Sequence, residues 1–346
     1  MNTIADTPFP ADARLIALRD WLRMLPAALG LEPESARPAS NDASFRRYFR
    51  VDAGNGTLIA MDAPPPMEDC RPFVQAARVL AEAGMNVPRV LAADPDRGIL
   101  LLTDFGDRTY LDELNDASAD ALYADASRAL VSLQAASRAG TFPDYDRELL
   151  HRELMLYPEW YVARHKGIAL TDAEQTTLHR SFETLLANNL AQPRVHVHRD
   201  YHSRNLMRLD GEANPGVLDF QDAVHGPLTY DLVSLLRDAY IGWPEERVID
   251  WAVRHWERAR KARLPVQQDF SEFYRDFEWM GLQRHLKVLG IFARLCHRDG
   301  KPKYLDDMPR VLDYVFKTAS RYNAFGGLAK LIERVESRES QVGYTF

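Results

Sequence analysis

The sequence predicts an α+β protein of two lobes, a small N-terminal lobe that contains a sheet and a larger C-terminal lobe that is mainly helical. Strand patterns with tight turns are concentrated before residue 104, whereas apolar residues at helical spacing dominate after it. The length of 346 residues also exceeds what one compact core usually holds. We therefore expect one lobe at residues 1–103 and the other at residues 104–346.

Local patterns assign the elements in order. Leucines at helical spacing predict a helix over residues 12–30, and the segments 40–51 and 57–64 flank Asn55-Gly56, a pair typical of β-hairpins. A helix over 69–83 and a buried strand within 98–106 complete the first lobe. Further helices are predicted at 110–139, 153–166, 173–190, 229–240, 245–263 and 268–297, with short strand pieces at 194–200, 206–209 and 216–220.

Composition excludes several classes of protein. A net charge of -7 and a pI near 5.8 argue against a nucleic-acid partner, because phosphate backbones favour a basic surface. Two cysteines in so long a chain, no signal-peptide pattern and no long apolar run predict a reducing, cytoplasmic setting without a membrane span. We infer no obligate protein partner.

The segment His198-Arg199-Asp200-Tyr201-His202-Ser203-Arg204-Asn205 follows an apolar strand, and Asp219 ends the next strand pair. Phosphoryl transfer needs one carboxylate that accepts the proton of the acceptor hydroxyl, and oxygen ligands that hold Mg²⁺ on the phosphates. Asp200, Asn205 and Asp219 have the types, order and spacing for these tasks. We assign Asp200 as catalytic base and the other two as magnesium ligands, with His198 holding the loop.

This segment resembles the aminoglycoside phosphotransferases and choline kinases of the protein-kinase-like superfamily, which place a histidine two residues after the base, as His202 is here. The resemblance implies a bilobal kinase fold, ATP and Mg²⁺ as cofactors, and a role for Asp231 in holding the catalytic loop. Asp104-Phe105-Gly106 spells the metal motif of kinases too early in the chain, and fits the hinge that would bind adenine. His297-Arg298-Asp299 lacks the following asparagine, so we do not assign it a second site.

The nucleotide side departs from the family pattern. The superfamily lysine is expected where Met61 and Asp62 stand, and the first lysine of the chain is Lys166. Among Arg46, Arg47 and Arg50 we favour Arg47 as the replacement cation, although each is also explained as a solvent-facing strand residue. The backbone near Ser44 and Phe45 would cover the phosphates, since a nest of N–H groups needs geometry more than glycine.

Two helical stretches, 152–167 and 277–295, together with the catalytic segment, resemble the bacterial anomeric sugar kinases that act on N-acetylmuramate and N-acetylglucosamine in cell-wall recycling. The carboxylate of N-acetylmuramate favours an arginine partner. Candidate acceptor contacts are His202, Arg204, Trp160 and Arg284, although a helix-surface role for the arginines and a core-facing role for Trp160 are the more common explanations. The alternatives are an aminoglycoside or choline-type kinase, and a pseudokinase that binds without catalysis.

Overall fold

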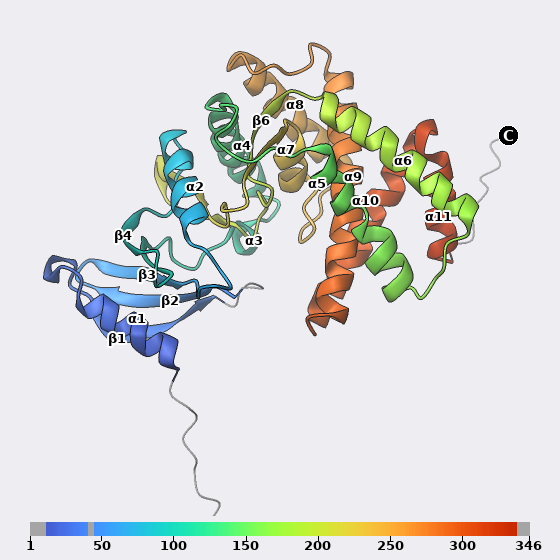
Figure 1. The fold of residues 1–346 in the computed structure, drawn as a ribbon. Coiled ribbons are helices and arrows are strands. Elements are labelled where there is room, and N and C mark those ends of the chain that lie inside the picture. Colours follow the sequence, from blue (N-terminus) through green and yellow to red (C-terminus); the bar gives the residue numbers. More distant parts are fainter. Residues whose placement is uncertain (1–11, 41–44, 338–346) are drawn as a thin grey trace, which may run out of the picture. The chain divides into compact units, whose positions relative to one another are not determined.

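The computed structural model describes residues 12–40 and 45–337, and the chain divides into two compact units. The first comprises Met1–Glu82 and Asn86–Asp107, and the second comprises Ala83–Met85 and Arg108–Phe346. Figure 1 labels helices and strands of both units. Among the helices in the described ranges, none is both long enough and apolar enough to cross a membrane.

The first unit is built on a five-stranded antiparallel sheet in the order β1-β2-β3-β5-β4 (Figure 1). Its strands are β1 (Glu32–Ser40), β2 (Arg47–Ala53), β3 (Gly56–Asp62), β4 (Val90–Asp94) and β5 (Ile99–Thr103). The predicted hairpin is confirmed, since Ala53 pairs with Gly56 across a two-residue turn. Gly56 has a φ of +106°, which glycine adopts without steric cost.

Two helices accompany this sheet, α1 (Ala13–Arg23) and α2 (Arg71–Glu82). Leu18, Trp21 and Leu22 of α1 form a core with Phe49, Val51, Ala60, Ile99 and Leu101 of the sheet. The predicted single helix over 12–30 is wrong in its second half. The chain leaves the α-helix at Met24 and forms only a 3₁₀ turn over Ala27–Leu29, because Pro26 cannot continue the helical hydrogen bonds.

The second unit is mainly helical, as predicted (Figure 1). The long helix α9 (Phe270–His297) packs against most of the other helices of this unit, including the π-helical segment Tyr157–His165 and α7 (Tyr230–Leu236). The other helices are α3 (Tyr110–Glu113), α4 (Ala119–Ala135), α5 (Arg147–Leu154), α6 (Asp172–Ala191), α8 (Glu245–Lys261), α10 (Met308–Arg321) and α11 (Gly326–Val335).

Two small antiparallel sheets within the second unit hold the segment that the sequence analysis singled out. β6 (Arg194–Val197) pairs with β9 (Val224–Pro227), and β7 (Leu206–Met207) pairs with β8 (Gly216–Val217). The first pair delivers residue 198 at the end of a buried strand. The second pair returns the chain so that residues 205 and 219 become neighbours.

Candidate active site

The loop that follows β6 is held by the carboxylate of Asp231, in the first turn of α7. The backbone N–H of His198 donates to Asp231 Oδ2 at 2.6 Å, and that of Arg199 donates to Oδ1 at 2.9 Å. Arg199 has a φ of +76°, a left-handed conformation that is uncommon for a residue other than glycine. Burial raises the pKa of Asp231 to about 7 against the opposing effect of these two hydrogen bonds. These contacts agree with the expectation that Asp231 holds the backbone of the loop.

Asp200 follows directly, and its backbone N–H donates to His198 Nδ1 at 3.3 Å. Burial lowers the pKa of His198 to about 4, so the imidazole is neutral and able to accept this bond. Burial alone would raise the pKa of Asp200, but the positive charges of Lys287, Arg284 and Arg199 help to hold the pKa below its usual range. Asp200 is therefore an ionised carboxylate at neutral pH, as a proton acceptor must be.

Asn205 and Asp219 are brought side by side by the β7–β8 hairpin. Asn205 Nδ2 donates to the carbonyl oxygen of Asp200 at 3.0 Å and lies 3.3 Å from Asp219 Oδ2. Gln221 Nε2 donates to Asp219 Oδ1 at 2.6 Å, and Asp219 itself has a φ of +62°. A carboxylate and an amide carbonyl are ligands that Mg²⁺ prefers, with phosphate and water oxygens completing the shell.

No group of three or more His, Cys, Asp or Glu side chains within residues 12–40 and 45–337 is placed to hold a metal ion on its own. Asn205 and Asp219 would supply only part of the shell of a magnesium ion that arrives with phosphate oxygens.

A buried carboxylate, Glu153 of α5, lies behind the loop and was missed by the sequence analysis. It accepts hydrogen bonds from Arg199 Nη2, from Lys287 Nζ at 2.9 Å and from the hydroxyl of Tyr145. Although burial opposes ionisation, Lys287 and Arg199 lower the pKa of Glu153. A signal was present in the sequence, because Glu153 lies between Leu150 and Leu154 on the buried face of its helix.

The candidate acceptor residues lie in the second unit with Asp200. His202 packs edge-on against the ring of Tyr240 at 5.3 Å, and burial lowers its pKa. Arg204 is exposed, and its guanidinium lies 4.7 Å from the centre of the same ring. Trp160 belongs to the π-helical segment, where the guanidinium of Arg164 covers its ring at 4.3 Å. Arg284 is buried in α9.

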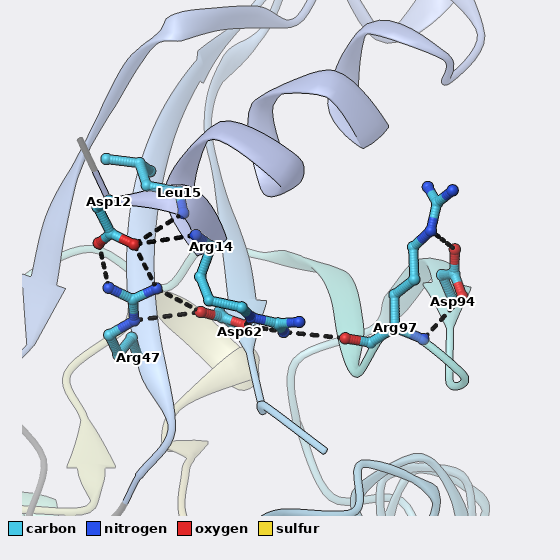
Figure 2. Close-up of polar contacts among 7 residues, drawn as sticks. All are labelled: Asp12, Arg14, Leu15, Arg47, Asp62, Asp94 and Arg97. Carbon is cyan, nitrogen blue, oxygen red and sulfur yellow. Dashed lines mark hydrogen bonds and ion pairs between the residues drawn. The ribbon is translucent and has the colours of Figure 1, made fainter. Parts of the chain in front are cut away.

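The nucleotide-side candidates lie in the first unit. Figure 2 shows Arg47 bonded through Nη2 to Asp62 at 2.6 Å and through Nη1 to Asp12, while Arg14 of α1 binds the same Asp62. Asp62 is fully buried at the end of β3. Arg47, the residue favoured as the replacement for the lysine, is therefore hydrogen-bonded to two carboxylates, on the sheet face that α1 covers.

The remaining nucleotide-side candidates have different surroundings. Asp104 accepts bonds from Arg50, from the Thr57 hydroxyl at 2.7 Å and from the backbone N–H of Gly106 at 2.8 Å. Phe45 keeps 60% of its surface exposed, and Phe105 is half-buried. Ser44 lies outside the described residues. Arg46, which was not favoured, forms an ion pair with Glu68 at 3.2 Å.

Solved structures of small-molecule phosphotransferases and kinases share this fold. A choline/ethanolamine kinase family protein from Mesorhizobium loti superposes with a TM-score of 0.59 at 15% identity, covering 93% of this chain and 99% of its own. An aminoglycoside phosphotransferase in a ternary complex with streptomycin and ATP superposes at 0.55 and 16% identity, covering 88% and 97%. At these identities the likeness establishes the fold.

Sequence comparison assigns the family. The profile of the phosphotransferase enzyme family matches residues 35–266, and the chain belongs to this family. An N-acetylmuramate/N-acetylglucosamine kinase of Pseudomonas aeruginosa is 49% identical over 328 residues, which are 93% of this chain and 96% of that protein. A protein of the same name from Neisseria meningitidis is 47% identical, covering 96% and 99%.

Proposed function

We propose that this enzyme transfers the γ-phosphoryl group of ATP to the anomeric hydroxyl of N-acetylmuramate, N-acetylglucosamine or both, in the recycling of cell-wall sugars. The observation that supports this most strongly is the 47–49% identity, over nearly the whole chain, to relatives named as kinases of these sugars. The proposed use of ATP in cell-wall recycling implies that the enzyme acts in the cytoplasm.

Asp200 is the proton acceptor of the proposed reaction. Its ionised carboxylate would orient the anomeric hydroxyl and take its proton as the sugar oxygen bonds to the γ-phosphorus and the bond to the ADP oxygen breaks. An anomeric hydroxyl is more acidic than an ordinary alcohol, so a carboxylate base suffices. The loop amides held by Asp231 fix the position of this carboxylate.

The residues for magnesium are Asn205 and Asp219. When bound, the ion would neutralise charge that develops on the transferring phosphoryl group. The hydrogen bond between Gln221 and Asp219 orients the carboxylate that would hold it. The proposed contacts on the nucleotide side remain Ser44, Phe45, Arg47, Asp104 and Phe105. Arg47 would keep its hydrogen bond to the buried carboxylate of Asp62.

A panel of acceptors tests the proposal. ADP release is measured with magnesium and ATP against N-acetylmuramate, N-acetylglucosamine, glucose, choline and kanamycin. The proposal predicts turnover with the two N-acetyl sugars and loss of that turnover when EDTA removes the metal. Turnover only with choline or kanamycin would refute the sugar assignment, and silence with all five acceptors would favour a binding protein without catalysis.

A further inference from the structure

Two arginines and one lysine are buried within the described part of the chain, and one of the three differs from the other two. Arg237, 6% exposed, donates to Glu278 at 2.8 Å, and Lys287, 7% exposed, pairs with Glu153 at 2.9 Å. Arg284 is 3% exposed and makes no hydrogen bond or ion pair with a described residue, and its Nε and Nη1 atoms are sealed without an acceptor.

Arg284 lies one turn before Lys287 on α9, close to the catalytic loop. Its guanidinium is 6.0 Å from the ring of Tyr230, the residue before Asp231. Its charge also acts on Asp200 and His202, lowering the pKa of each. Asp200 and His202 are themselves partly exposed to solvent.

A buried guanidinium without an acceptor is costly, because each desolvated donor forfeits its bonds to water. Native proteins satisfy nearly all such groups, and an exception calls for an explanation such as a missing ligand. A carboxylate is the acceptor that a guanidinium binds best, through short charge-assisted hydrogen bonds. The cost is recovered if a carboxylate of the substrate reaches Arg284.

We propose that Arg284 binds the lactyl carboxylate of N-acetylmuramate and thereby favours this acidic sugar over its neutral counterpart as the acceptor. This inference rests on the proposed function. Two other arginines of this unit, Arg204 and Arg164, are exposed and lie over aromatic rings, where water screens their charge.

The test removes the charge from the protein and from the substrate in turn. N-acetylmuramate is compared with its lactyl amide as acceptors for the wild-type enzyme and for Arg284→Gln. The inference predicts that the wild type prefers the acid by about 10- to 100-fold in kcat/KM. The variant should bring this ratio to about one, and any common loss from a disturbed Asp200 cancels in the ratio.

Arg275→Gln is the matched control, since Arg275 lies on the same helix, is exposed and pairs with Asp276 at 3.3 Å. It should leave the acid-to-amide ratio at the wild-type value. An unchanged ratio in Arg284→Gln would overturn the inference, because binding of ATP phosphates or simple support of Asp200 reduces both substrates equally. If the variant does not fold, the wild type alone decides: equal rates with acid and amide overturn the inference. Absence of turnover with any amino sugar would refute the proposed function itself.

Discussion

The carboxylate of Asp231 accepts a 2.6 Å hydrogen bond from the backbone N–H of His198, two residues before the proposed base. The second carboxylate oxygen takes the N–H of Arg199. One side chain of α7 thereby satisfies two consecutive backbone amides, and the second of them belongs to Arg199, which has a positive φ. The position of Asp200 depends on this attachment.

Replacing Asp231 with alanine should therefore uncouple catalysis from nucleotide binding. The two orphaned amides cost about 1–3 kcal/mol each in unfolding free energy if nothing replaces the carboxylate. We expect kcat to fall while the Kd for magnesium-ATP changes little, as measured by steady-state kinetics and calorimetry. A variant with wild-type kcat would contradict the supporting role of Asp231.

Glu153→Gln should destabilise the protein strongly. The substitution leaves the cations of Arg199 and Lys287 buried without their counter-charge, and breaking such a pair costs about 3–5 kcal/mol. Glu148→Gln, on the same helix, removes only an exposed carboxylate 3.9 Å from Arg152 and should cost about 0.5 kcal/mol or less. Urea unfolding of both variants measures the difference, and equal costs would refute the importance of the buried network.

Two glycines of α9 should respond oppositely to alanine. A Cβ on Gly290 would lie 2.4 Å from the backbone of Leu156, so the helices must separate, and we expect a loss of about 1–3 kcal/mol. A Cβ on Gly281 would meet Val233 at an ordinary 3.5 Å, and alanine there should gain up to about 1 kcal/mol from helix propensity. Thermal unfolding compares them, and a stabilised Gly290→Ala would contradict the packing described.

His255 makes stability depend on pH. Burial lowers its pKa from 6.5 to about 3, and its Nδ1 lies 2.8 Å from the Ser127 hydroxyl. The unfolded chain therefore binds a proton that the folded protein excludes, so this contribution to stability is present above pH 6.5 and is lost as pH falls. The stability advantage of the wild type over His255→Asn should shrink by about 2 kcal/mol between pH 6 and pH 4.5. A constant difference in urea unfolding across that range would show that His255 does not titrate as described.

The proximity of Asp200, Asn205 and Asp219 could be predicted from the sequence because it depends on local geometry. His198, Asp200 and Asn205 lie in one short loop after a strand, and the β7–β8 hairpin needs only a few residues to return Asp219 to Asn205. Residue type and spacing are therefore enough to predict that these side chains lie near one another. Glu153 reaches the same loop from another helix, and no spacing in the sequence shows that contact.

Two features of the first unit, strand β1 and the surroundings of Arg47, could not be predicted from the sequence. β1 was not predicted because Pro33, Pro38 and several polar residues give it low strand propensity, and it pairs with β2 through two irregularities in register. The surroundings of Arg47 were equally hidden. Whether a strand residue faces α1 or the opposite side depends on register, and Arg47 lies directly across from Asp62.

The most direct test of the central claim is phosphorus NMR of the product formed from N-acetylmuramate, magnesium and ATP by the wild type and by Asp200→Asn. We predict one new phosphate coupled to the anomeric proton in the wild-type reaction, and a rate about 100- to 10,000-fold lower for the variant. A phosphate on another hydroxyl would contradict the anomeric assignment. Wild-type rates from Asp200→Asn would show that Asp200 is not the base.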